Sequence, residues 1–326
     1  MLPQVNEPLV TVIAACYNHS QFALECLESI RCQTYCNIEL IIADDCSTDD
    51  SAERIRAWVD EHAVECQLVL HDRNQGLCRT LNDALSIATG KYVAMVATDD
   101  VWFPEKTARQ VAMLEALPER VAVVYSDTYL IDGTGGKLPG RFLERCERFD
   151  MPEGDIFPIL LRDWAFILPM TTLIRRSCLE AVGAYDETLV FEDLDMWLRL
   201  GRQYHFAFDP TVVGSYRIHP GSMVQLRSVE ITKSCIAIFS KWLREPGFNR
   251  TVKRRIAEQW WTLTQLEPER RWRHAGAALR ADRSLRSYVK LLLLALGIPF
   301  ARVTPLLALN RRLRKAVGDR HIVRPR

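Results

Sequence analysis

A short apolar run that ends in two adjacent acids constrains this fold more than any other feature. Tyr92–Ala97 consists of β-formers and small apolar residues, which is typical of a strand buried on both faces of a parallel sheet. Asp99 and Asp100 follow, and two carboxylates there are costly unless a cation or hydrogen-bond donors satisfy them. Ligands of open α/β sheets bind at the carboxyl ends of strands, so we expect chemistry at this pair. Helix capping near Pro104 would account for only one of the two acids.

The rest of the first half alternates strands and helices. Apolar, β-rich runs predict strands, and helical spacing of apolar residues predicts a helix after each of the first four strands. The predicted strands are residues 9–15, 38–43, 67–71, 92–97 and 121–126. This order indicates an α/β protein with a doubly wound, mostly parallel sheet. No G-x-G-x-x-G motif follows the first strand, so the dinucleotide-binding fingerprint is absent.

Polar residues also follow the other strands of this half. Tyr17 offers an aromatic face suited to stacking on a nucleobase, although core packing explains it equally well. Asp45 follows the second strand, where an acid is placed to accept hydrogen bonds from a ribose or base. Arg79 begins a later helix and either approaches a diphosphate or is a solvated surface arginine. The Gly-rich stretch at 133–136 is interpreted as a hairpin tip, since no strand–turn–helix frames it.

Four segments in register resemble glycosyltransferase family 2. They are residues 12–18, 41–49, 74–76 and 98–100, and their order and spacing match over about residues 8–220. The resemblance implies a GT-A (Rossmann-like) fold and an inverting transfer from a nucleotide sugar. It also implies a domain over residues 1–223, with a donor half at about 8–130 and an acceptor half at about 131–223.

Site residues follow from the same resemblance. Asp100 and His219 would bind Mn²⁺ or Mg²⁺, with Thr98 standing where the family commonly has another Asp. The resemblance assigns five residues to the donor: Ala15, Tyr17, Asp45, Arg79 and Asp99. Tyr17 would stack on the base that Asp45 reads, and Asp99 would contact the ribose.

A second acidic pair, Glu192 and Asp193, precedes a predicted helix. Acids there can be simple partners of the helix dipole. A sugar transfer to a hydroxyl also needs a base, which a partly desolvated carboxylate can supply. By resemblance Asp193 is that base, and Glu192 assists the acceptor or metal site. Trp164 and Trp197 are expected in the acceptor region.

Residues 224–326 are predicted to form a helical, basic C-terminal extension. From Lys241 onward there are 21 Lys and Arg against 6 Asp and Glu, whereas the preceding residues hold 21 against 35. The segment Leu291–Leu309, with basic flanks, is expected to lie in an anionic membrane interface; the alternative is a helical pair packed on the body. A nucleic-acid partner is not expected, since only this extension would support one. No segment is long enough for a confident transmembrane helix.

The ten cysteines form no CxxC pair, and residues 1–8 carry no apolar signal core. We therefore expect a cytoplasmic protein with reduced thiols, bound peripherally to the inner face of the cell membrane.

The predicted function is an inverting glycosyltransferase that uses a nucleoside-diphosphate sugar such as a UDP-sugar. Its acceptor would be a saccharide or lipid-linked saccharide in cell-surface polysaccharide or glycolipid assembly. One alternative is a sugar nucleotidyltransferase, which usually needs a Gly-rich basic phosphate loop at the first strand, and none is present. The other is a catalytically degenerate nucleotide-sugar-binding scaffold, against which the retained acids argue.

Overall fold

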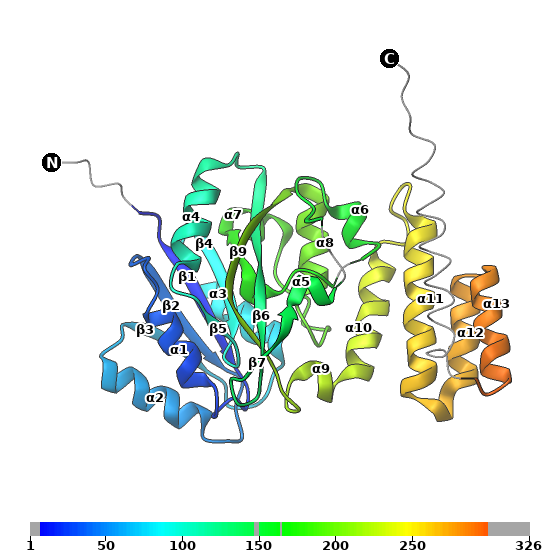
Figure 1. Ribbon diagram of the computed structural model, residues 1–326, viewed down its shortest axis with the longest axis horizontal. Helices are drawn as coiled ribbons and strands as arrows, with labels where there is room; N and C mark the ends of the chain where they lie inside the picture. The colour runs from blue at the N-terminus through cyan, green and yellow to red at the C-terminus, as the bar shows by residue number, and fades with distance from the viewer. Residues whose placement is uncertain (1–6, 147–149, 164, 299–326) are drawn as a thin grey trace, which may run out of the picture. The chain divides into compact units, whose positions relative to one another are not determined.

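The computed structural model describes residues 7–146, 150–163 and 165–298 (Figure 1). Its contacts divide the chain into two compact units, Met1–Lys241 and Trp242–Arg326. Helix α10 (Ser228–Lys241) therefore goes with the first unit, although the boundary expected from sequence precedes it. Lys241 explains the assignment, because its Nζ donates to Asp186 (2.7 Å) and to the buried Asp195 of α8 (2.6 Å).

The first unit is built on a sheet with the strand order β3-β2-β1-β4-β8-β6-β9-β5, in which β7 pairs with β6. β1 pairs in parallel with β2 and β4, and β2 with β3, which confirms the predicted mostly parallel α/β fold. The strands are β1 (Val10–Cys16), β2 (Ile38–Asp44), β3 (Cys66–Leu70), β4 (Tyr92–Ala97), β5 (Val101–Trp102), β6 (Val121–Asp132), β7 (Lys137–Arg141), β8 (Thr172–Arg175) and β9 (His205–Ile218).

The main departure from the predicted sheet is β8. This strand was not predicted, and it lies antiparallel between β4 and β6. Because β8 is antiparallel to both β4 and β6, β6 runs in the same direction as β4, and β8 separates the two strands. Four buried residues after a 3₁₀ turn, η1 (Pro169–Thr171), give too short a run for a periodic signal. The hairpin at residues 133–136 is confirmed by the pairing of β6 with β7.

Helices cover both faces of the sheet. α1 (Ala23–Arg31), α2 (Ser51–His62) and α4 (Lys106–Ala116) pack on one face, where alternate residues of β1 point. α3 (Leu77–Ile87) packs over β1 and β2 from the other face. The remaining helices of this unit are α5 (Phe142–Arg145), α6 (Phe157–Leu160), α7 (Arg176–Val182), α8 (Asp193–Gln203) and α9 (Met223–Leu226).

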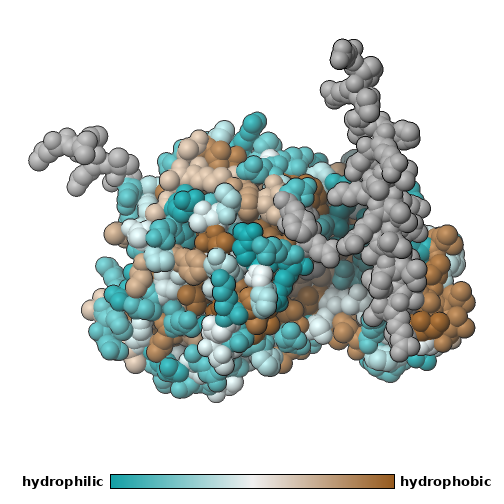
Figure 2. Space-filling model, viewed as in Figure 1, coloured by the Kyte–Doolittle hydropathy of each residue, from teal (hydrophilic) through white to brown (hydrophobic). Residues whose placement is uncertain are grey.

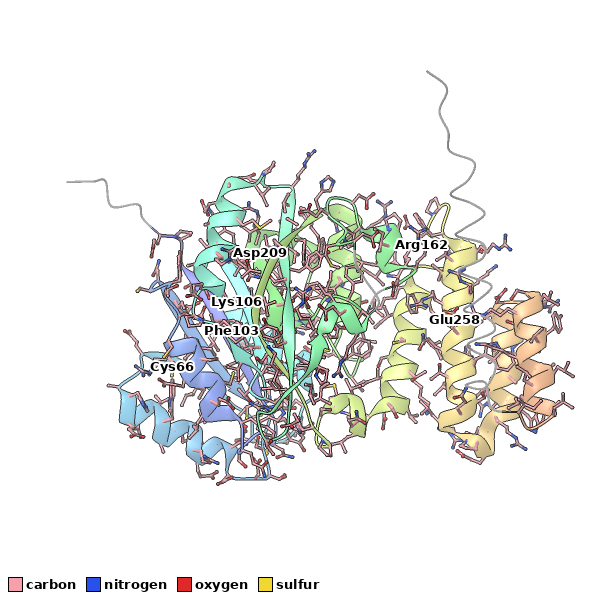
Figure 3. All side chains as sticks on the ribbon, in the orientation of Figure 1. Cys66, Phe103, Lys106, Arg162, Asp209 and Glu258 are labelled. Carbon is pink, nitrogen blue, oxygen red and sulfur yellow. The ribbon has the colours of Figure 1, made fainter. Side chains whose placement is uncertain are left out.

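The buried Lys106 of α4 forms a hydrogen bond to β8, the strand that was not predicted. Lys106 is 1% exposed, and its Nζ donates to Gln110 Oε1 (2.9 Å) and to the carbonyl of Thr172 (3.1 Å) (Figure 3). The same Nζ lies 4.0 Å from the ring centroid of Trp102. Burial lowers the pKa of Lys106 to about 7. The side chain thus anchors β8 at the cost of desolvating its ammonium group.

The second unit is helical where the structure describes it, as predicted. Its elements are α11 (Asn249–Leu266), the 3₁₀ turn η2 (Pro268–Arg270), α12 (Arg271–Ala281) and α13 (Leu285–Ala295). A small core of Ala257, Trp261, Ala275 and Ala278 holds α11 against α12. Within the described ranges, no helix combines the length and the apolar character needed to cross a membrane.

Candidate active site

The carboxyl ends of three parallel strands meet at one edge of the sheet. The amide of Thr98, after β4, donates to the carbonyl of Ala15 in β1 (2.9 Å), and the amide of Asp45, after β2, donates to the carbonyl of Cys16 (3.0 Å). Ala97 is exposed although the rest of β4 is buried. The loops after β1, β2 and β4 therefore converge on an accessible edge, where a ligand of an open α/β sheet binds.

The turn after β1 presents Tyr17 to solvent. Asn18 adopts a left-handed conformation with φ of 58°, which an asparagine tolerates. Its Oδ1 accepts a hydrogen bond from the amide of Thr48 (2.7 Å), and its own amide donates to Ser47 Oγ (2.8 Å). Tyr17 is 42% exposed. The core-packing interpretation of Tyr17 is therefore wrong, and its ring is available to a ligand.

Asp45 holds the loop that precedes α3. Its Oδ1 accepts from the amide of Gln75 (2.7 Å) and lies 2.9 Å from His71 Nδ1, while Oδ2 accepts from the amide of Gly76 (2.8 Å). Gly76 has a φ of 91°, a conformation that favours glycine. Because a carboxylate has about four acceptor positions, these bonds leave about one, on Oδ2, for a ligand.

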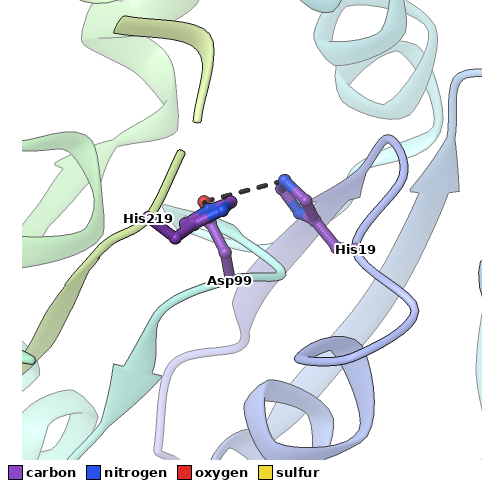
Figure 4. A group of neighbouring side chains, drawn as sticks. All are labelled: His19, Asp99 and His219. Atoms are coloured by element: carbon purple, nitrogen blue, oxygen red, sulfur yellow. Dashed lines mark hydrogen bonds and ion pairs between the residues drawn. The ribbon is translucent and has the colours of Figure 1, made fainter. Parts of the chain in front are cut away.

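Asp99 lies between two histidines from separate segments (Figure 4). His219, just after β9, places Nε2 3.1 Å from Asp99 Oδ2, and His19, after β1, places Nε2 3.6 Å from the same oxygen. One ligand atom of each residue falls within 4.8 Å of the others. Two imidazoles and a carboxylate are donors suited to a divalent transition-metal ion. His19 Nδ1 lies 3.0 Å from Thr98 Oγ1, which orients the ring.

Charges at this cluster favour an ionised carboxylate. Burial by itself would raise the pKa of Asp99, but the hydrogen bond with His219 and the charges of His19 and His219 lower it overall. Burial lowers the pKa of His19, against the opposing effect of Asp99. An ionised Asp99 carboxylate is the form that ligates a metal ion.

Asp100 turns toward β9 instead of toward the histidines. Its Oδ1 accepts from the amide of Arg217 (2.9 Å), and burial followed by the charge of Asp99 raises its pKa well above the usual range. The motif predicts Asp100 with His219 as the metal group, whereas the structure groups Asp99 with His219 and adds His19.

Arg217 stabilises the turn at Asp99–Asp100, and it was not predicted from the sequence as a site residue. Its guanidinium is 2% exposed, and Nε donates to the carbonyl of Asp99 (2.7 Å). One terminal nitrogen donates to Glu25 Oε2 (2.6 Å), and the guanidinium carbon lies 4.7 Å from the ring centroid of Phe22. Arg217 and His219 share the end of β9, so one strand supplies both a metal-site imidazole and the group that positions the acids.

The second acidic pair begins α8. Glu192 is the N-cap residue, and Asp193 accepts a hydrogen bond from the amide of Leu194. Burial raises the pKa of Asp193 to about 7, and burial followed by the charge of Asp193 raises that of Glu192 to about 8. Among the described residues, no Lys or Arg forms an ion pair with either acid. A carboxylate with a pKa near neutrality is suited to proton transfer.

Tyr216 links the two acidic pairs. Its hydroxyl pKa is raised first by burial and then by the charges of four acids. Those acids are Asp100, Asp99, Asp193 and Glu192. Both pairs therefore lie within electrostatic reach of one half-buried side chain on β9.

Two of the expected site residues are placed differently, and a third is not described. Arg79 is exposed and pairs with Asp83 (3.0 Å) and Glu187 (3.5 Å), as the surface interpretation has it. Trp197, expected in the acceptor region, is 3% exposed and donates its indole N–H to the carbonyl of Ile167, so its ring belongs to the core. Trp164 lies outside the described residues.

Comparisons with known proteins agree with this fold. The sequence model of the family described as Glycosyl transferase family 2 matches residues 11–183. The chain is 30% identical over 222 residues to the uncharacterized glycosyltransferase RP339 of Rickettsia prowazekii. The aligned region covers 67% of this chain and 67% of that protein.

Two solved structures share the fold. The crystal structure of S. aureus TarS 1-349 in complex with UDP-GlcNAc has a TM-score of 0.62 at 17% identity, over 84% of this chain and 81% of that one. The mannosyltransferase PcManGT from Pyrobaculum calidifontis, in complex with GDP-Man and Mn²⁺, has a TM-score of 0.58 at 21% identity, over 96% and 84%. At these identities the likeness concerns the fold alone, which is that of GT-A glycosyltransferases.

Proposed function

This chain belongs to glycosyl transferase family 2 and is a glycosyltransferase, and from that premise we propose an inverting enzyme that uses a nucleoside-diphosphate sugar. The observation that carries the proposal is that the charges of both acidic pairs act on the same Tyr216 hydroxyl. Asp99 is grouped with two histidines, whereas Asp193 has a raised pKa. The first group would serve the leaving diphosphate, and the second acid would serve as the base.

The donor would lie along the loops after β1 and β2. The exposed ring of Tyr17 is available to stack on the nucleobase, and the remaining acceptor position of Asp45 can take one hydrogen bond from it. TarS and PcManGT were solved with UDP-GlcNAc and GDP-Man, which supports a nucleoside-diphosphate sugar for this chain. We propose UDP as the nucleotide.

His19, Asp99 and His219 would hold a divalent cation. Their two nitrogens and one oxygen favour Mn²⁺ over Mg²⁺, which prefers oxygen ligands alone. When bound, the ion supplies positive charge to the departing diphosphate. Asp100 has Oδ1 committed to Arg217, so it can offer only Oδ2 to the same ion or to the ribose.

Asp193 would be the base of the transfer. The acceptor hydroxyl oxygen forms a bond to the anomeric carbon while the bond from that carbon to the diphosphate breaks on the opposite face. The hydroxyl proton passes to the Asp193 carboxylate, and one displacement inverts the anomeric configuration. Glu192, with the higher pKa, would stay protonated at neutral pH and donate a hydrogen bond to the acceptor.

The acceptor proposed here is a hydroxyl of a saccharide or lipid-linked saccharide, in cell-surface polysaccharide or glycolipid assembly. A membrane-held acceptor would suit a protein whose second unit binds a membrane surface.

Asp193→Asn tests the role of the base. The variant should keep its melting temperature and its stabilisation by UDP-GlcNAc with Mn²⁺, and lose transfer by at least about a hundredfold. Asp60→Asn, on the exposed face of α2, is the matched control and should behave as wild type. Full transfer by Asp193→Asn would remove the role of the base, and retention of configuration by NMR would contradict the inverting mechanism. A wild-type protein that binds donor without turnover would indicate the scaffold alternative.

A further inference from the structure

Helix α13 exposes a continuous apolar stripe. Leu285, Tyr288, Leu292 and Leu296 recur at helical spacing along one face, and they are 80%, 50%, 59% and 63% exposed. The opposite face of the helix carries the buried Ser287 and packs toward the small core of α11 and α12. The brown surface at the right of the view in Figure 2 covers this region. Exposed apolar side chains that form one continuous face favour an interaction site.

Exposed apolar side chains are concentrated in this part of the chain. Seven of the twelve large hydrophobic residues that are exposed in the described ranges lie in the second unit, which is the shorter one. Trp272 on α12 is among them, 53% exposed. Tyrosine and tryptophan combine an apolar ring with a polar group, as residues at a lipid–water interface do.

The same unit is rich in exposed cations. α13 contains no Asp or Glu; of its two cations, Arg286 pairs with Glu258 (3.2 Å) and Lys290 is half-buried, so the unpaired charge lies before this helix. Among the described residues, no carboxylate forms an ion pair with any of four exposed arginines near the stripe in sequence: Arg271, Arg273, Arg280 and Arg283. Downstream, residues 299–326 add eight Lys and Arg against one Asp. An apolar stripe accompanied by unpaired positive charge is complementary to an anionic lipid surface.

We propose that the second unit binds peripherally to an anionic bilayer through the stripe of α13 and the arginines of α12 and the α12–α13 connection. The helix has 11 residues and lies flat with its leucines below the headgroups, because it is too short to span a bilayer. The charges favour lipid over a second copy of this unit, since two equally basic surfaces repel each other. This inference is independent of the transfer reaction.

Vesicle co-sedimentation of the full chain tests the proposal. Vesicles of phosphatidylcholine with about 30% phosphatidylglycerol should bind the protein, pure phosphatidylcholine should bind it far less, and rising NaCl should release it. Leu292→Glu should weaken binding at least about tenfold. Arg271→Gln with Arg273→Gln should weaken it about twenty-five-fold, because each cation near an anionic surface contributes a factor of about five.

Leu226→Glu is the matched control, since Leu226 is 68% exposed on α9 of the first unit, and it should bind like wild type. Circular dichroism and melting temperature establish that each variant folds. Equal loss in Leu226→Glu, equal binding to neutral vesicles, or no binding by wild type would overturn the proposal. A dimer in light scattering that Leu292→Glu converts to monomer, without vesicle binding, would assign the stripe to a second copy instead.

Discussion

The main-chain amide of Arg217 donates a hydrogen bond to Asp100 Oδ1 at 2.9 Å, while Nε of its side chain donates to the carbonyl of Asp99 at 2.7 Å. One residue at the end of β9 thus donates hydrogen bonds to both members of an acidic pair, of which Asp100 lies 117 positions earlier in the chain. The contact sets the Asp99 carboxylate beside His219, two residues further along.

Arg217→Met should loosen this turn. The variant keeps the main-chain bond to Asp100 but loses the side-chain bonds to Asp99, Asp132 and Glu25. Because Glu25 is largely exposed, its ion pair adds little, and we expect a loss of about 1–3 kcal/mol in unfolding free energy. Mn²⁺ affinity should fall as well. Arg56→Met, on the exposed side of α2, is the control; a variant with wild-type stability and wild-type Mn²⁺ affinity would refute the positioning role.

His19→Ala and His219→Ala should each reduce Mn²⁺ affinity by at least about tenfold, because each removes one ligand of a three-residue site. Isothermal titration with MnCl₂ in the presence of UDP measures this loss. His62→Ala, on the exposed part of α2, should bind Mn²⁺ like wild type. A comparison of Asp99→Asn with Asp100→Asn separates the two acids, and a larger loss for Asp100→Asn would favour the ligand assignment that the motif predicts.

Transfer should depend on pH through Asp193. Its carboxylate accepts a proton only when ionised, and burial raises its pKa to about 7. The ratio kcat/KM should therefore fall about tenfold for each pH unit below 7, and it should decrease again above about pH 8, where Glu192 loses the proton that it donates to the acceptor. The measurement is a profile from about pH 5.5 to pH 9 at saturating Mn²⁺. A profile that stays flat down to pH 5.5 would show that the base has an ordinary carboxylate pKa.

Lys106 should make stability rise with pH. Burial lowers its pKa to about 7, so between pH 7 and its unfolded value the unfolded chain holds more protons than the native protein. Stability then increases with pH in that window, by up to about 1.4 kcal/mol per unit. Below pH 7 both states are protonated and this dependence ends.

The difference between wild type and Lys106→Met isolates this contribution. Urea unfolding at pH 7.5 and pH 9 should show that the wild-type increment is reduced in Lys106→Met, since other titrating groups are common to both proteins. Lys91→Met removes an exposed lysine paired with Glu115 and should keep the increment. Identical increments in Lys106→Met and wild type would mean that Lys106 does not titrate in this range.

Much of the fold was predictable because local patterns carry it. Strands β1, β2 and β4 are short apolar runs buried inside the sheet, and β3 is a short run at its edge; a helix with one apolar face follows each of them. The acids after β2 and β4 were identified because they interrupt such runs. β8 was missed because its four residues acquire their role from neighbours on both sides, not from any periodicity of their own.

Some site residues were not predicted for the same reason. His19 contacts Asp99, and Arg217 contacts the turn at Asp99–Asp100. Both contacts join segments that are far apart in the sequence. The only local hint was their place, beside Tyr17-Asn18 and before His219. Trp197 was expected in the acceptor region, but helix α8 turns it into the core.

The most direct test of the central claim is anomalous diffraction from Mn²⁺ in crystals grown with UDP-GlcNAc. The account predicts a peak about 2.0–2.6 Å from Asp99 and at least one of the two histidines, with the diphosphate beside it and the Asp193 carboxylate facing the sugar from the opposite side. A peak remote from Asp99, or an Asp193 carboxylate directed away from the anomeric carbon, would contradict it.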